Sequence, residues 1–230
     1  MRILHVIKRL DFADGGPPVI VTRLATAQVQ LGHAVTVACY ACPADEQSQN
    51  QLAKLANWNK VRFLRFPQPD RLEQLIGGDA GRRLGPLVAE ADVVHIHNVW
   101  ETILLRTAAA ARSAGKPYVV LLNGMLEPWS LNQRRWKKKL ALAVAHRRML
   151  NSSATLHVST ENERDLIAPL GLTAPSVVIP NGVALEEIES LPPPGQFIGA
   201  RPRLAGRRFI LFMGRLHFKK GLDYLADAFA

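Results

Sequence analysis

The stretches RILHVIK at residues 2–8, PPVIVTRLATAQVQL at 17–31 and AVTVACY at 34–40 decide the fold class. The first and third are short apolar runs rich in β-branched residues, which is typical of strands. The middle stretch is longer, opens on two prolines and ends just before Gly32, which is the pattern of a helix. Strand, helix and strand in this order form a βαβ unit, whose two strands lie parallel in one sheet.

The same alternation of short apolar runs and helical stretches continues along the chain. Further strands are predicted at residues 60–66, 92–97, 117–122, 154–158 and 176–179, with helices between most of them. Apolar strands separated by helices indicate a parallel sheet that is covered on both faces. We therefore predict an α/β fold, a doubly wound parallel sheet of the Rossmann-like type.

The texture of the sequence changes after Val183, where three consecutive prolines and several glycines appear. We predict a first domain at residues 1–185 and an interdomain linker at 186–206. A strand at 208–213 and a helix after Gly221 would begin a second domain at 207–230. One strand and one helix do not bury a core, so we expect this second α/β domain to be truncated.

Composition fits a globular protein, with 48% hydrophobic and 21% charged residues in 230. A charged residue, Lys8, interrupts the first apolar run, which argues against a signal peptide, and no run approaches the roughly 18 apolar residues of a membrane-spanning helix. We therefore expect a cytoplasmic protein. Its 29 lysines and arginines exceed its 19 acidic residues and give a net charge of +10.

Much of the positive charge is concentrated between Pro128 and Leu150, a segment with seven basic residues and no acidic one. Such a cluster indicates either a surface for nucleic acid, anionic lipid or phosphorylated ligands, or a solvated helix face. Within the segment the apolar residues Trp136, Leu140, Ala143 and Leu150 recur at helical spacing and are predicted to share one face. That face either lies on an anionic membrane surface or packs on the domain's own sheet.

The loop after the first strand contains Gly15 and Gly16, followed by two prolines. Ligands of open α/β sheets bind beyond the carboxyl ends of the strands, where this loop lies. The paired glycines let the backbone approach a ligand, and the helix that follows offers N–H groups to an anion. The loop does not match G-x-G-x-x-G, the fingerprint of dinucleotide binding. A simple tight turn is the alternative.

The fourth predicted strand ends in His95, Ile96, His97 and Asn98, and alternation places the two histidines on one face. No third ligand lies at a convincing spacing, so we predict no metal site. The pair Cys39 and Cys42 also lacks the partners of a structural zinc site. We interpret His95 as a core histidine, and His97 and Asn98, nearest the rim, as hydrogen-bonding groups for a polyhydroxylated ligand.

The next two loops are also polar. The first contains Asn123, Gly124 and Trp129, and the indole of Trp129 either stacks on a sugar ring or anchors the loop. In the second, Ser159 or Thr160 is predicted to cap a helix, and Glu163 completes the capping box.

These segments together resemble family-4 glycosyltransferases, the large retaining group with the GT-B fold. The resemblance covers nearly the whole chain and rests on the order of seven motifs: GGPP at 15–18, GHAVTV at 32–37, DVVHIHNVW at 92–100, GMLEPW at 124–129, STENE at 159–163, IPNGV at 179–183, and FMGRL at 212–216 with KKGLD at 219–223. No single motif is decisive.

The resemblance implies a nucleotide-sugar donor and a saccharide or lipid-linked acceptor, in polysaccharide or glycolipid biosynthesis. It implies transfer with retention and without a metal or cofactor. Arg215 and Lys220 match the positions that balance the departing diphosphate, beside Gly15 and Gly16. His97, Asn98, Asn123, Gly124 and Trp129 would bind the acceptor. Family members often have histidine or arginine where this chain has Asn123, so acid–base chemistry is not expected there.

The isolated chain is expected to be inactive, because the donor side of such enzymes continues beyond residue 230. We expect no nucleic-acid partner, and a peripheral position at the inner face of the membrane. A non-catalytic module that docks on anionic lipid or on a partner protein is the alternative function. A nicotinamide-dependent oxidoreductase shares only the fold class and is opposed by the missing fingerprint.

Overall fold

The computed structural model describes residues 1–42, 50–183, 189, 192–214, 216 and 220–229. The chain divides into two compact units, Met1–Gly182 and Val183–Ala230, which are described separately. The linker that was predicted at 186–206 falls within the second unit. Within the described parts of the chain, no helix is both long and apolar enough to cross a bilayer.

Unit Met1–Gly182 is built on one sheet of seven strands. They are β1 (Arg2–Val6), β2 (Ala34–Tyr40), β3 (Arg62–Phe66), β4 (Val93–His97), β5 (Tyr118–Leu121), β6 (Thr155–Val158) and β7 (Ser176–Val178). Their order is β3-β2-β1-β4-β5-β6-β7, and every neighbouring pair is parallel. The predicted fold class, a doubly wound parallel sheet, is therefore confirmed.

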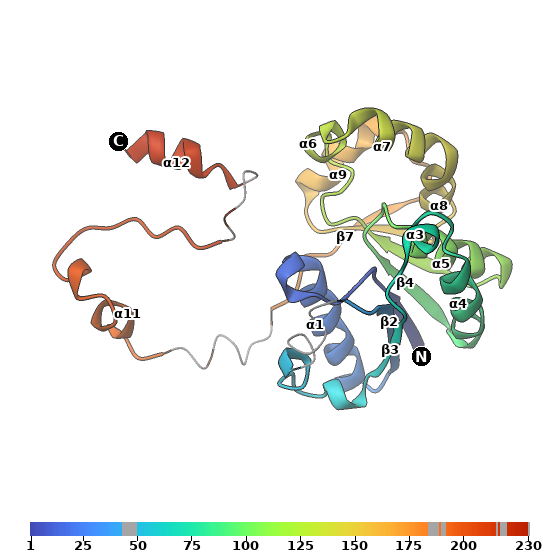
Figure 1. Cartoon of the computed structure of the whole chain (residues 1–230), viewed down its shortest axis with the longest axis horizontal. Coiled ribbons are helices and arrows are strands. Elements are labelled where there is room, and N and C mark those ends of the chain that lie inside the picture. The colour runs from blue at the N-terminus through green and yellow to red at the C-terminus, as the bar shows by residue number, and fades with distance from the viewer. Residues whose placement is uncertain (43–49, 184–188, 190–191, 215, 217–219, 230) are drawn as a thin grey trace. The chain divides into compact units, whose positions relative to one another are not determined.

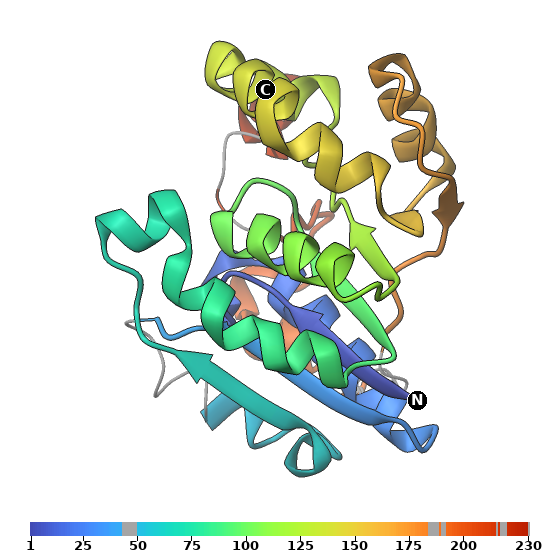
Figure 2. The same ribbon diagram turned by 90° about the vertical axis from the view of Figure 1, so that its right-hand side faces the viewer.

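Helices cover both faces of this sheet (Figures 1 and 2). They include α1 (Gly16–Gln30), α3 (Arg71–Ile76), α4 (Gly78–Glu90), α5 (Thr102–Ser113), α6 (Pro128–Asn132), α7 (Arg135–Ala141), α8 (Arg147–Asn151) and α9 (Glu161–Ile167). A π-helical segment, η3 (Leu142–His146), joins α7 to α8, and short 3-10 turns lie at η1 (Phe12–Asp14), η2 (Trp58–Lys60) and η4 (Ala168–Leu170).

Two apolar layers lie on the opposite faces of the sheet, because successive strand residues point to opposite sides. On one face, Ile3 and Ile7 of the β1 segment pack with Val21 and Ala25 of α1. On the other face, the larger cluster joins Leu4 and Val6 to side chains of α4, α5 and α8. Figure 2 shows α4 and α5 in front of the strands and α1 behind them.

The predicted strands all occur in this unit, with shorter ends than expected. The clearest difference is at residues 60–66, where the strand begins at Arg62. The preceding residues form the turn η2 because the Trp58 side chain is buried in the core and the Val61 N–H bonds to the Trp58 carbonyl. Lys60, the first residue of the expected strand, therefore belongs to the turn.

Unit Val183–Ala230 contains α11 (Gln196–Gly199), η5 (Pro202–Leu204) and α12 (Leu222–Phe229). The helix expected after Gly221 is confirmed by α12. The strand predicted at residues 208–213 is wrong: those residues have no regular secondary structure. A strand is stabilised by a paired neighbour, and all strands among the described residues belong to the other unit.

Candidate functional site

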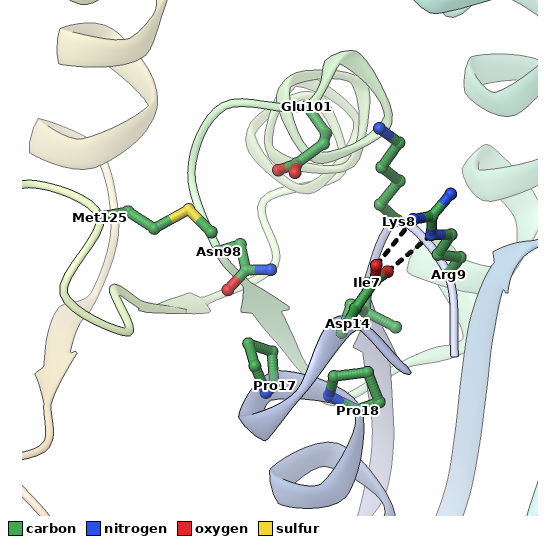
Figure 3. Close-up of a pocket in the computed structure, with 9 residues that line it drawn as sticks. All are labelled: Ile7, Lys8, Arg9, Asp14, Pro17, Pro18, Asn98, Glu101 and Met125. Carbon is green, nitrogen blue, oxygen red and sulfur yellow. Dashed lines mark hydrogen bonds and ion pairs between the residues drawn. The ribbon is translucent and has the colours of Figure 1, made fainter. Parts of the chain in front are cut away.

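A cavity of about 270 Å³ opens beyond the carboxyl ends of β1 and β4 (Figure 3). The strand order reverses between these two strands, because β2 and β3 extend to one side and β4 to β7 to the other. Such a switch point is the usual ligand site of an open α/β sheet. The lining residues are Ile7, Lys8, Arg9, Asp14, Pro17, Pro18, Asn98, Glu101 and Met125.

The side of the cavity after β1 is fixed by an ion pair. Arg9 donates from Nε to Asp14 Oδ2 at 2.6 Å and from Nη2 to Asp14 Oδ1 at 2.7 Å. This two-pronged hydrogen bond raises the pKa of the Arg9 guanidinium. The adjacent Lys8 lines the same cavity. The loop between β1 and α1 is thus held in one conformation.

The paired glycines stand at the start of α1, next to the cavity. Gly15 has φ +96°, a conformation that favours glycine, and α1 begins at Gly16 with prolines in its first turn. A Cβ added at Gly16 would meet no atom within 4 Å, so this backbone is open to a ligand. The cavity itself is lined by Pro17 and Pro18 rather than by the two glycines.

Asn98 follows β4 and lines the cavity, as expected for a residue near the rim. Its neighbour after β5 is Asn123, whose Nδ2 donates to Asn98 Oδ1 at 2.8 Å. Both asparagines have positive φ, 78° and 51°, in the left-handed region that this residue type tolerates. The bond engages the Asn98 oxygen, so Asn98 offers its NH₂ group to a ligand. Asn123 therefore holds two loops together.

Glu101 is a residue that sequence reasoning missed. Its carboxylate points toward the cavity, opposite Lys8, and it also lines a second cavity of about 160 Å³ that shares Lys8 (Figure 3). Its Oε2 is buried without a hydrogen-bond partner among the described residues, and burial raises the pKa of this carboxyl group. A carboxylate oxygen in this position is suited to accept a hydrogen bond from a ligand hydroxyl. The sequence feature that could have identified Glu101 is its position: it is an acidic residue between the end of a predicted strand and the helix that follows.

The expectation that His97 lies at the rim is wrong, because its side chain is completely buried. Its Nε2 lies 2.9 Å from His5 Nδ1, and His5 Nε2 lies 2.7 Å from Gln28 Oε1 of α1. Strand pairing places His5 beside His95, and the three rings are stacked within the α1 face of the sheet. A side chain in this position does not touch a ligand in the cavity.

These three histidines form the one group of potential metal ligands found among the described residues, with ligand atoms within 4.8 Å of one another. The neighbourhood of His5 and the other two histidines was not predicted, because His5 lies in a different strand, distant in sequence. Burial lowers the pKa of His5 to about 4 and also lowers the pKa values of His95 and His97. The rings are therefore neutral, and two of them already share a hydrogen bond. We interpret the cluster as a polar network of the core.

The loop after β5 is anchored by Glu163 of α9. Gly124, with φ +71°, donates its N–H to Glu163 Oε1 at 2.6 Å, and Ser159 donates to Glu163 Oε2 at 2.7 Å. Thr160 caps the helix as predicted, by accepting from the Glu163 N–H at 3.0 Å. Glu163 was predicted to complete the capping box, but its carboxylate bonds to the N–H of Ser159 rather than to that of the cap Thr160. Through Gly124 it also holds the loop that brings Met125 to the cavity.

The remaining predicted site residues are not part of the cavity wall. Trp129 lies in α6 and is partly exposed. Lys220 is exposed in the second unit. Arg215 lies outside the described residues. The structure thus brings together Asn98, Asn123 and the loop of Gly124, and adds Lys8 and Glu101 to the site.

Comparisons with known proteins agree with this architecture. A model of the glycosyl transfer family described as "Glycosyl transferase 4-like domain" matches residues 15–182. A comparison with curated protein sequences found no significant match.

Several solved structures share the fold at low sequence identity. An S. aureus MnaA–UDP co-structure is 13% identical with a TM-score of 0.52, and the match covers 77% of this chain and 43% of that one. A putative UDP-N-acetylglucosamine 2-epimerase from Listeria monocytogenes is 12% identical with a TM-score of 0.51, covering 74% and 42%. The UDP-N-acetylglucosamine 2-epimerase from Rickettsia bellii is 12% identical with a TM-score of 0.51, covering 76% and 44%. The chain therefore spans less than half the length of these proteins.

Proposed function

The chain belongs to the family of glycosyl transferase 4-like domains, and on that premise we propose that it forms the acceptor-binding part of a hexosyltransferase. The enzyme transfers a hexosyl group from a nucleotide sugar to a saccharide or lipid-linked acceptor, with retention at the anomeric carbon. It acts in polysaccharide or glycolipid biosynthesis, on the cytoplasmic side of a membrane. The observation that carries the proposal is the polar cavity at the switch point of the sheet.

The acceptor binds in this cavity through its hydroxyl groups. The NH₂ group of Asn98 and the Lys8 ammonium donate hydrogen bonds, and the Glu101 carboxylate accepts one. Donors and an acceptor in one small polar cavity match a sugar, whose hydroxyls do both. Glu101 positions the reacting hydroxyl. Its oxygen bonds to the anomeric carbon as the bond from that carbon to the nucleoside diphosphate breaks, and the hydroxyl proton passes to a phosphate oxygen of the departing nucleoside diphosphate.

For the donor diphosphate, the start of α1 offers an open backbone at Gly16 and free N–H groups. The family resemblance assigns Arg215 and Lys220 to the same diphosphate, so the proposed reaction uses no resident metal ion. UDP-sugars are the first donors to test, because one structure of similar fold contains UDP.

The experiment uses the longest natural protein that contains this chain. It is incubated with UDP-hexoses, UDP-N-acetylhexosamines and GDP-hexoses, together with oligosaccharides or a total lipid extract. Release of the nucleoside diphosphate that depends on the acceptor, with an α-linked product from an α-linked donor by NMR, is the expected result. Conversion of UDP-N-acetylglucosamine into its C2 epimer without any acceptor would instead place the protein among epimerases.

In the same assay, Arg215→Ala and Lys220→Ala are expected to lower kcat/KM on the order of a hundredfold each, because each removes a preorganised cation from the leaving diphosphate. Arg207→Ala is the matched control, since Arg207 is an exposed cation of the same unit without an assigned role. Equal activity of all three variants would remove the two residues from the donor site.

A non-catalytic module that docks on anionic lipid or on a partner protein is the second candidate, favoured by the exposed apolar and basic side chains of residues 135–148. The two functions differ in a simple measurement. A binding module gives no transfer with any donor and acceptor, even in the longest natural protein, whereas the transferase is inactive only as the isolated 230-residue chain.

A further inference from the structure

The helical segment 135–151, formed by α7, η3 and α8, has one buried side and one apolar exposed side. Leu142, Met149 and Leu150 are buried against the core of the unit. On the other side, Trp136, Leu140 and Val144 are 79%, 66% and 75% exposed. These three residues follow one another at steps of four, so they form a continuous row on one helix face, here named the interfacial stripe. Figure 1 shows α7 on the outside of its unit.

The π-helical segment Leu142–His146 decides which residues belong to the stripe. Each π-helical residue turns the chain through a smaller angle than an α-helical one, so the face of the helix shifts after it. Leu150 was expected beside Trp136 and Leu140, but it is completely buried, and that part of the prediction is wrong. Ala143 is exposed as expected, next to Val144.

Exposed basic residues surround the interfacial stripe: Arg134, Arg135, Lys137, Lys139 and Arg148. In the described part of the chain none of them takes part in an ion pair, and no acidic residue lies between Pro128 and Leu150. Lys139 Nζ lies 5.6 Å from the centre of the Trp136 ring. The surface therefore combines an aromatic and two aliphatic side chains with uncompensated positive charge.

Lys138 has a different position from its neighbours. Its Nζ donates to the Ser130 carbonyl at 2.7 Å and lies 5.2 Å from the centre of the Trp100 ring. Burial lowers the pKa of this ammonium group. Lys138 therefore ties α7 to the loop that carries Trp100 and Glu101, instead of facing outward.

We propose that the interfacial stripe and its basic rim are a docking surface for an anionic lipid bilayer. Trp136, Leu140 and Val144 enter the headgroup region, and the outward lysines and arginines contact lipid phosphates. Charge complementarity favours a bilayer as the partner. The apolar row is surrounded by basic residues, and segment 128–150 contains no acidic residue, which matches a negatively charged membrane. The inference deepens the proposed function, in that a bilayer presents a lipid-linked acceptor to the adjacent loop, but lipid binding itself needs no sugar transfer.

The test is co-sedimentation of the purified chain with vesicles that contain phosphatidylcholine and increasing amounts of phosphatidylglycerol. Binding is expected to increase with the anionic fraction and to decrease with salt. The double variant Lys137→Gln/Lys139→Gln is expected to lose roughly tenfold or more in partition coefficient. Lys138→Gln is the control for Lys137→Gln alone, because each removes one charge and Lys138 faces inward. Circular dichroism checks that each variant is folded.

The apolar contribution is tested with Trp136→Ala/Leu140→Ser, which should abolish the residual binding at high salt. The matched control is Leu72→Ser/Leu75→Ser, since these leucines of α3 are 63% and 79% exposed but have no basic rim of this kind. Three results would overturn the proposal. They are equal binding to neutral and anionic vesicles, no vesicle binding at low salt, and an equal loss of vesicle binding in the Trp136→Ala/Leu140→Ser and Leu72→Ser/Leu75→Ser variants. A concentration-dependent dimer that the Trp136 variant abolishes, without vesicle binding, would assign the stripe to self-association. Sugar transfer without vesicle binding would leave the proposed function intact.

Discussion

Among single residues, Glu101 has the clearest functional signature, because the fold bears a cost for it. A buried carboxylate oxygen without a partner destabilises a protein unless a ligand satisfies it. Function and stability therefore have opposite requirements at this position, as they often do in binding sites. The two shared cavities beside Glu101 are the space in which that ligand would lie.

Glu101→Gln is expected to stabilise the chain by about 1 kcal/mol at neutral pH, because it removes a buried negative charge. Burial raises the folded-state pKa above the ordinary value of 4.5, so the penalty is absent below that value and complete above the folded-state pKa. The stabilisation should disappear as the pH falls toward about 4. Urea unfolding at several pH values measures it, and the acceptor KM should rise in the longest natural protein.

Glu90→Gln serves as the control, since Glu90 is exposed and forms a surface ion pair with Arg62. The unfolding free energy of the Glu90→Gln variant should stay close to that of the wild type, because surface ion pairs contribute about 0–1 kcal/mol. A Glu101→Gln variant that is less stable than the wild type at neutral pH would mean that the backbone hydrogen bonds of the carboxylate and its attraction to Lys8 outweigh the cost of burying the charge.

At this scale the sequence predicted some residues well and others badly. Thr160 was identifiable as a cap because the capping box is a local pattern. Glu101 and the pairing of His5 with His97 were not, because both depend on contacts between segments that are distant in sequence. His97 was misplaced for a related reason: alternation gives the face of a side chain, but not the depth of the helix that covers it.

Among the elements, the tie between α9 and the loop after β5 has a direct energetic consequence. Glu163 accepts hydrogen bonds from the backbones of Gly124 and Ser159 and is itself buried. In Glu163→Gln one of these N–H groups faces an NH₂ group instead of an oxygen. Bonds to charged groups contribute about 1.5–3 kcal/mol each, so we expect a loss of about 2–3 kcal/mol in unfolding free energy.

Urea denaturation measures this loss, with Glu161→Gln as the control in the same helix turn. Glu161 is exposed and forms a surface ion pair with Arg164, so its replacement should cost less than about 1 kcal/mol. If both variants lost the same stability, the loop contact would be energetically unimportant and Glu163 would act only as a cap.

Element identities were largely predictable, because apolar runs of strand length and helix length alternate clearly in the first unit. The π-helical segment η3 was not, since nothing in the residues 142–146 differs from an ordinary helix. Its consequence was the wrong placement of Leu150. The strand predicted at 208–213 failed for the opposite reason: the local sequence suits a strand, but no described strand lies in that unit to pair with it.

For the molecule as a whole, the buried histidines predict how stability depends on pH. The pKa of His5 is lowered to about 4, and the pKa values of His95 and His97 are also lowered. An unfolded chain binds protons at these positions below about pH 6.5, whereas the folded chain does not. The stability that depends on keeping these histidines neutral is therefore fully present above about pH 6.5. It is lost as the pH falls from there toward the pKa values of the histidines in the folded chain.

Each proton taken up only on unfolding changes the unfolding free energy by about 1.4 kcal/mol per pH unit. Urea unfolding between about pH 7 and 5, where most carboxyl groups remain ionised, should thus show a steep decline. His33→Gln should leave the slope unchanged, because His33 lies at the surface near the N-terminus. A flat profile over this range would mean that the pKa values of the three rings are not lowered in the folded core.

The fold class and its ligand-binding edge followed from the sequence, because the order of elements fixes where the strands end. Which of the polar residues at that edge reach the cavity depended on side-chain packing, and the relation between the two units lies beyond what local patterns specify. The family resemblance added the identity of the chemistry, which the fold alone does not give.

The bond between Gly124 and Glu163 also affects how the protein ages. Asparagine followed by glycine deamidates when the glycine nitrogen attacks the asparagine side chain, and the chain contains this pair at 123–124 and 181–182. The Gly124 nitrogen is engaged by Glu163, and the Asn123 amide is held by Asn98. Asn181 and Gly182 are exposed, and a Cβ added at Gly182 would meet no atom within 4 Å. During storage, deamidation of the folded chain is therefore expected at Asn181. Asn123 should deamidate only in molecules whose loop has locally unfolded.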